Sequence, residues 1–155
     1  CPSCYRMWQN HYPREFEIAH VTQFLRGLIA SGRLVLQGLD LTVTYHDPCD
    51  LGRGSGEYDA PRDIIRSIPG IRFVELTNNS ENCKCCGGGG NLEMIDSDLS
   101  ADIAKAKIDE VLHTGAEAVV TACQQCVRTM ATYARRNKIS LEVMDIVQLI
   151  QKALK

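Results

Sequence analysis

The sequence predicts an α/β domain in which helices flank a parallel β-sheet. Short runs of β-forming residues alternate with segments whose apolar residues recur at helical spacing, which is typical of parallel strands joined by right-handed crossovers. At 155 residues the chain is long enough to bury a core as one domain. Its 45% apolar and 23% charged residues are ordinary for a soluble globular protein.

Two helices and two strands are expected in the first half of the chain. The first helix is indicated by apolar residues at helical spacing, and the second by a proline near its first turn. The strands are runs of β-branched and aromatic residues. The expected elements are a helix over 16–29, a strand over 41–45, a helix over 60–68 and a strand over 71–76.

The second half begins with a polar loop from Thr77, followed by three helices and two strands. Ser97 and Asp98 are candidate caps for the first of these helices, and Gly115 stands where a helix-terminating glycine belongs. The expected elements are a helix over 97–112, a buried strand over 118–121, a helix over 124–136, a strand over 141–143 and a helix over 145–154.

Five cysteines form the most informative pattern in the chain. Cys49 is followed after 35 residues by the pair Cys85-Cys86, and after 36 more by Cys123 and Cys126 as a CxxC motif. A disulfide within an adjacent pair is strained, and a chain of this size folds without disulfides. The CxxC spacing by itself fits either a metal or a redox disulfide. Taken together, the five favour a metal site and a reducing cytoplasm.

The expected strands carry these cysteines to one place. Cys49, the Cys85-Cys86 pair and Cys123 each follow a predicted strand, and the carboxyl ends of parallel strands meet at one edge of the sheet. Cys123 and Cys126 also lie at the start of a helix, where the helix dipole favours thiolates. The glycines over 87–90 would let backbone N–H groups approach sulfur closely. We therefore expect one shared thiolate site.

Charge and hydropathy argue against several other functions. A net charge of -2 predicts no nucleic-acid or anionic-membrane binding. No apolar run approaches the roughly 18 residues of a membrane-spanning helix. No signal peptide is visible, and a chain opening on Cys1 is interpreted as a fragment.

Three segments carry a resemblance to a known family. They are the sequence YHDPCDLGR over 45–53, CCGGGG over 85–90 and ACQQC over 122–126. Together they resemble the cysteine-rich CCG domain, which is found in the B and D subunits of heterodisulfide reductases. The same domain also occurs in the iron-sulfur subunits of enzymes that oxidise glycolate, lactate and glycerol-3-phosphate. The CxxC of Cys1 and Cys4 resembles the end of a preceding copy. This division makes 1–15 the tail of that copy and 16–155 a C-terminal CCG domain.

The resemblance implies an enzyme subunit that binds iron. Its implied cofactor is a noncubane [4Fe-4S] cluster, and the family's ligands fall on Cys49, Cys85, Cys86, Cys123 and Cys126. The implied activity is reduction of a small-molecule disulfide by one-electron steps, with electrons from partner iron-sulfur or flavin subunits. The implied location is the cytoplasm, with membrane association through a partner subunit.

Two alternatives to this function stay open. One is an electron-relay subunit of a flavin-dependent 2-hydroxy-acid dehydrogenase of the glycolate or lactate type. The other is a non-catalytic zinc-binding domain that mediates assembly, because thiolates also bind zinc.

Other polar residues have competing interpretations. His46 either donates a proton to a departing thiolate or packs within its loop. Cys83 is expected to be a spare, exposed loop thiol without a partner, rather than a substitute ligand or redox partner. Arg53 and Arg62 are each expected to be solvated or to form a structural salt bridge, rather than to bind substrate anions. His20 is expected to be structural.

Overall fold

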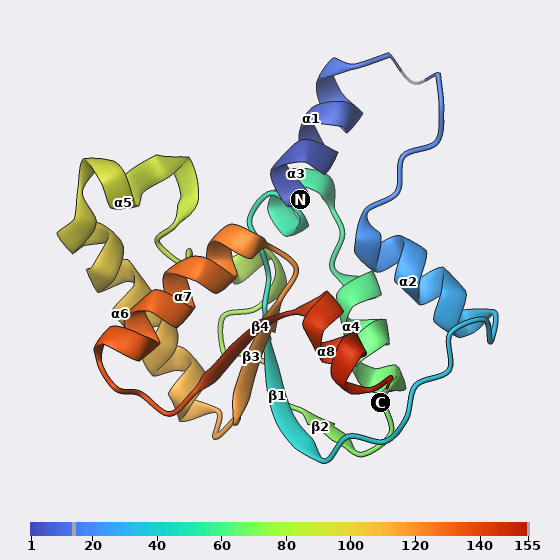
Figure 1. The fold of residues 1–155 in the computed structure, drawn as a ribbon. Coiled ribbons are helices and arrows are strands. Elements are labelled where there is room, and N and C mark those ends of the chain that lie inside the picture. The colour runs from blue at the N-terminus through green and yellow to red at the C-terminus, as the bar shows by residue number, and fades with distance from the viewer. Residues whose placement is uncertain (14, 155) are drawn as a thin grey trace.

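A four-stranded parallel sheet forms the centre of the fold (Figure 1). The computed structural model describes residues 1–13 and 15–154. The strands lie in the order β2-β1-β3-β4, and each neighbouring pair is parallel. The predicted α/β class is therefore confirmed. The strands are β1 (Leu41–His46), β2 (Ile71–Phe73), β3 (Ala118–Thr121) and β4 (Glu142–Asp145).

The described helices include all five expected ones and three that were not predicted. The expected helices are α2 (Val21–Ala30), α4 (Asp59–Ser67), α6 (Ser97–His113), α7 (Gln124–Arg136) and α8 (Ile146–Lys152). The additional ones are α1 (Pro2–His11), α3 (Gly52–Ser55) and α5 (Leu92–Ile95). Helix α7 and strand β3 have the predicted bounds, whereas the other expected elements differ from prediction by a few residues at one end or both.

The largest boundary error is at the start of α2, which was expected at residue 16. The helix begins at Val21 because His20 caps it: its Nδ1 accepts the backbone N–H of Thr22 at 3.4 Å. The Gln23 side chain in turn accepts the backbone N–H of His20 at 3.0 Å. The predicted structural role of His20 is thus seen as a helix cap.

Two hydrophobic cores lie on opposite faces of the sheet. Helices α4 and α8 cover one face, with α2 packed on the outer side of α4, and α6 and α7 cover the other face (Figure 1). On the first face Val43, Tyr45 and Val120 pack against Ile64 and other apolar residues. On the second, Val119 and its neighbours pack against α6 and α7. Because side chains alternate along a strand, His46 and its register partner Thr121 point to the second face.

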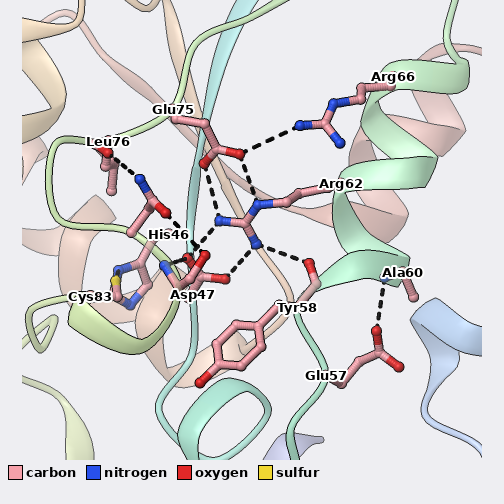
Figure 2. Close-up of polar contacts among 12 residues, drawn as sticks. His46, Asp47, Glu57, Tyr58, Ala60, Arg62, Arg66, Glu75, Leu76 and Cys83 are labelled. Carbon is pink, nitrogen blue, oxygen red and sulfur yellow. Dashed lines mark hydrogen bonds and ion pairs between the residues drawn. The ribbon is translucent and has the colours of Figure 1, made fainter.

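A buried arginine holds the carboxyl end of the sheet together. The Arg62 guanidinium donates two bonds to Asp47, after β1, at 2.7 and 2.9 Å. It donates two more to Glu75, after β2, at 2.8 and 3.0 Å, as Figure 2 shows. A fifth bond, of 2.9 Å, reaches the Tyr58 carbonyl. All five N–H groups of Arg62 are therefore used, and the expected salt-bridge role is seen.

The charges around Arg62 compensate for its burial. Burial lowers the pKa of Arg62, but the hydrogen bonds and charges of Asp47 and Glu75 outweigh this and raise it above its ordinary value. Asp47 also accepts the backbone N–H of Ser80 at 2.8 Å. The loop that carries the cysteine pair is thereby fixed to the end of β1.

Replacing Arg62 by Met should lower the free energy of unfolding by about 3–5 kcal/mol, because it leaves the Asp47 carboxylate buried without its partner. Urea unfolding measures the change. Arg66→Met is the matched control: Arg66 also reaches Glu75, at 3.7 Å, but its side chain is 57% exposed, so the loss should stay below about 1 kcal/mol. Equal losses in the two variants would contradict this account.

Stability should also fall between pH 6.5 and pH 4 because of His20. Burial is the main cause that lowers the pKa of His20 from 6.5 to about 4. In this range the unfolded chain binds a proton that the folded chain does not, so the contribution of neutral His20 is complete above pH 6.5 and is lost as the pH falls toward 4. His20→Asn keeps a capping side chain and should flatten the pH dependence of urea unfolding. The control variant His11→Asn, at an exposed position, should leave the pH dependence of urea unfolding unchanged.

Candidate metal centre

A cavity of about 250 Å³ lies at the carboxyl edge of the sheet. The loops after β1 and β2 and the start of α7 contribute to its wall. The cavity is lined by all the predicted site residues, namely His46, Cys49, Cys85, Cys86, Cys123 and Cys126. Residues separated by up to 80 positions in sequence therefore border one space, as expected from their positions after successive strands.

The sulfur atoms differ in depth. Cys86 and Cys126 are buried, and their Sγ atoms lie 3.2 Å apart. Cys123 is half-buried, whereas Cys49 and Cys85 are exposed. Donor atoms of Cys86, Cys126 and His46 all lie within 4.8 Å of one another. The deep end of the cavity thus has buried sulfur and nitrogen donors, and its open end has accessible sulfur.

The start of α7 favours negative charge on Cys123. This residue is the N-cap of α7, and Cys126 lies in the first turn. Hydrogen bonding from the Cys126 side chain and from backbone N–H groups at the helix start outweighs burial and lowers the pKa of Cys123 to about 6. The CxxC motif is therefore placed where unpaired backbone donors stabilise a thiolate.

The glycine run lies against the cysteine pair. The backbone N–H of Gly87 donates to Cys85 Sγ at 3.3 Å, and that of Gly88 to Cys86 Sγ at 3.5 Å. Gly87 has a φ of +87°, and a Cβ there would lie 2.5 Å from the Ser100 carbonyl oxygen of α6. The predicted close approach of backbone to sulfur is confirmed, and for Gly87 it requires glycine.

The crowded thiols oppose one another's ionisation. Hydrogen bonds from Cys126 and Cys85 lower the pKa of Cys86, while hydrogen bonding to Cys86 and burial raise that of Cys85. Hydrogen bonding to Cys123 and Cys86, together with burial, raises the pKa of Cys126. Sulfurs that share this space cannot all be thiolates unless a cation offsets their charge. The donor set therefore fits a thiophilic metal group, which would deprotonate them.

Cys83 is not the exposed thiol without a partner that the sequence predicted. Its side chain is buried, with Sγ 3.5 Å from His46 Nδ1 and 3.7 Å from Lys107 Nζ. Burial favours the neutral thiol, but the hydrogen bond to His46 and the charges of His46 and Lys107 outweigh it and lower the pKa of Cys83. The loop sequence is polar, yet this side chain contacts Lys107 of α6 and is shielded from solvent.

His46 is also buried, at the end of β1. Burial lowers its pKa, but hydrogen bonds with Cys83 and Cys86 outweigh this effect and raise the pKa to about 9. Figure 2 shows the imidazole beside Cys83 and close to the Arg62 network. The imidazole is thus held between a cavity thiol, Cys86, and a thiol outside the predicted set, Cys83.

Sequence reasoning missed Lys107, although the helical pattern contains a signal for it. Lys107 occupies the same face of α6 as the buried residues Ala104, Ile108 and Val111. A charged residue on a buried helical face is uncommon unless it has a partner.

The rim of the cavity is held by ionic and backbone contacts. Arg53 donates to the carbonyl oxygens of Glu81 and Cys83 at 3.1 and 2.6 Å, so it braces the cysteine loop. Asp50 accepts a 2.7 Å bond from Arg6 of α1 and another from Ser3. Helix α1 therefore lies at the rim, while Cys1 and Cys4 are exposed. Across the described residues, no helix is both long and apolar enough to cross a membrane.

The fold and the cavity define a cysteine-rich α/β domain with a soft-metal donor set. Residues 43–131 match the cysteine-rich domain family CCG, and the chain belongs to this family. The resemblance inferred from the three cysteine segments is thereby confirmed.

Several relatives are similar over nearly the whole chain. The chain is 36% identical to the D subunit of dihydromethanophenazine:CoB–CoM heterodisulfide reductase from Methanosarcina acetivorans, and the match covers 99% of the chain and 39% of that protein. It is 31% identical to the probable iron-sulfur-binding oxidoreductase FadF of Bacillus subtilis, covering 99% of the chain and 23% of that protein. The chain is also 30% identical to the B subunit of fumarate reductase (CoM/CoB) from Methanothermobacter marburgensis, over 99% of the chain and 31% of that protein. The chain thus spans well under half the length of each.

Gly88→Ala should destabilise the fold and disturb the cysteine pair. An added methyl group would overlap the Thr129 hydroxyl of α7, and overpacking of this kind costs about 1–3 kcal/mol. Thermal unfolding and iron content measure the two effects. Gly89→Ala is the control, because a Cβ at Gly89 meets nothing within 4 Å. Similar losses in both variants would show that the close contact with α7 is unimportant.

Proposed function

We propose that this domain holds a noncubane [4Fe-4S] cluster through Cys49, Cys85, Cys86, Cys123 and Cys126. The observation that carries the proposal is that these five cysteines line one cavity, with Gly87 and Gly88 N–H groups directed at two of the sulfurs. Five thiolates exceed the four needed by zinc or an ordinary cubane cluster, so an open, distorted cluster suits this donor set better.

We further propose that the chain is part of an iron-sulfur oxidoreductase subunit that reduces a small-molecule disulfide. The similarity to the D subunit of a heterodisulfide reductase over 99% of the chain supports this assignment. When bound, the cluster would supply the one-electron chemistry needed to split a disulfide. Exposed Cys49 and Cys85 border the open end of the cavity, where a substrate sulfur would approach.

His46 is proposed to hold the proton for a departing sulfur. It lines the cavity, and its raised pKa, about 9, keeps the ring protonated at neutral pH. Nδ1 faces Cys83, which fixes the ring's orientation. A proton is thus held on a buried side chain at the cavity wall.

The domain division and the partners belong to the same proposal. We assign 16–155 to a C-terminal CCG domain and 1–15 to the tail of a preceding one, since the chain covers only 39% of the heterodisulfide reductase protein that it resembles. Electrons would come from partner iron-sulfur or flavin subunits in the cytoplasm, with membrane association through such a partner. The similarity to FadF, a probable iron-sulfur-binding oxidoreductase, is also compatible with an electron-relay subunit, which would lack disulfide reductase activity.

Cys85→Ser should remove the cluster and leave the fold intact, because Cys85 is exposed and its sulfur contributes no core packing. Iron and sulfide analysis with EPR on anaerobically purified protein measures the cluster, and circular dichroism measures the fold. Cys83→Ser is the control, since Cys83 lies outside the proposed ligand set and should keep its iron.

If the Cys85→Ser variant retained iron and still reduced a disulfide with viologen as the electron donor, this result would contradict the ligand assignment. Zinc without an EPR signal in the unmodified protein would instead favour an assembly domain, with zinc bound near His46, Cys86 and Cys126. A normal cluster without disulfide reduction would favour the relay.

A further inference from the structure

A fully buried lysine lies behind the metal cavity. The Lys107 side chain on α6 has no exposed surface, and its ammonium group contacts Glu110 at 2.6 Å. It also donates to Cys83 Sγ at 3.7 Å. Burying a charge in this way is costly unless it is paired, so the position of Lys107 calls for an explanation beyond packing.

The partner carboxylate, Glu110, is fixed by Asn78. Glu110 Oε1 accepts hydrogen bonds from Asn78, at 2.8 Å from the backbone N–H and 2.7 Å from the side-chain amide. Glu110 Oε2 accepts the lysine. The ion pair therefore has a fixed direction, with its negative end toward Asn78 and its positive end toward Cys83.

Cys83 connects the lysine to the cavity. Its sulfur contacts both Lys107 Nζ and His46 Nδ1, and one ring nitrogen of His46 lies within 4.8 Å of the sulfurs of Cys86 and Cys126. These five side chains are all buried. In such surroundings a charge is screened less than at the surface.

We propose that Lys107 is a positioning residue that acts through Cys83 and raises the reduction potential of the metal group bound by the five cysteines. This inference rests on the function proposed above. Uptake of one electron adds one negative charge to the cavity and neither forms nor breaks a bond in the protein. The nearby positive end of the ion pair stabilises that added charge, so it favours the reduced state.

Substitutions at the two ends of the pair should shift the potential in opposite directions. Lys107→Met removes the positive end and should lower the midpoint potential. Glu110→Gln keeps a hydrogen-bond acceptor for Asn78 but removes the negative end, so it should raise the potential. A tenfold change in the ratio of oxidised to reduced protein corresponds to about 59 mV for a one-electron couple, and we expect shifts on this scale.

The measurement is an EPR-monitored titration of the anaerobically purified full-length holoprotein, with dithionite as the one-electron donor. Lys105→Met is the matched control. Lys105 lies on the same helix and pairs with Asp109 at 2.6 Å, but its side chain is 59% exposed. Solvent screening should leave the potential of this variant unchanged.

The outcomes separate this inference from the proposed function. A full iron content with no shift, or with both variants shifted in the same direction, overturns the role of Lys107 and leaves the cluster assignment standing. Absence of an iron-sulfur signal in the unmodified protein overturns both. If Lys107→Met fails to retain iron, Glu110→Gln decides: an upward shift supports the inference, and an unchanged potential overturns it.

Discussion

The geometry of the cavity depends on the buried guanidinium of Arg62. Two parallel strands bring their carboxyl ends to the same edge, but the loops that follow them need a further constraint to keep one arrangement. Arg62 supplies it by binding Asp47 after β1 and Glu75 after β2 with all its donors in use. Asp47 extends this constraint to Ser80 in the cysteine loop. A planar cation with five fixed donors does this better than a lysine would.

The fold was predictable wherever local pattern and tertiary packing agree. Helix α7 has both a strong helical pattern and a clear start after β3, and its predicted bounds are those observed. The start of α2 was not predictable from apolar spacing, because Phe16 and Ile18 continue the pattern into a segment that is not helical. Capping by His20 decides the boundary there. The four-residue helices α3 and α5 are too short to leave a periodic signal.

The candidate site was predictable in its membership but not in its surroundings. The alternation of strands and helices along the sequence was enough to place Cys49, Cys86 and Cys123 at one edge of the sheet, because that inference needs only the topology. The burial of Cys83 arises from tertiary structure, and its contact with Lys107 of α6 joins residues 24 positions apart. Composition of the loop indicates exposure, so no local rule could have placed Cys83 beside an ammonium group. Such contacts appear only once the layers are assembled.

The glycine run has a consequence for the order of events in metal loading. Gly87 lies against Ser100 of α6, and Gly88 against Thr129 of α7, so packing against the two helices holds the loop between them. Small zinc domains fold only as they bind their ion, and binding then includes the entropy of ordering the chain. Here that entropy is lost when the sheet and helices form. We therefore expect metal binding by this domain to require little further ordering of the chain. The shape of the site should then contribute to the choice of metal group, together with the affinity of the metal for sulfur.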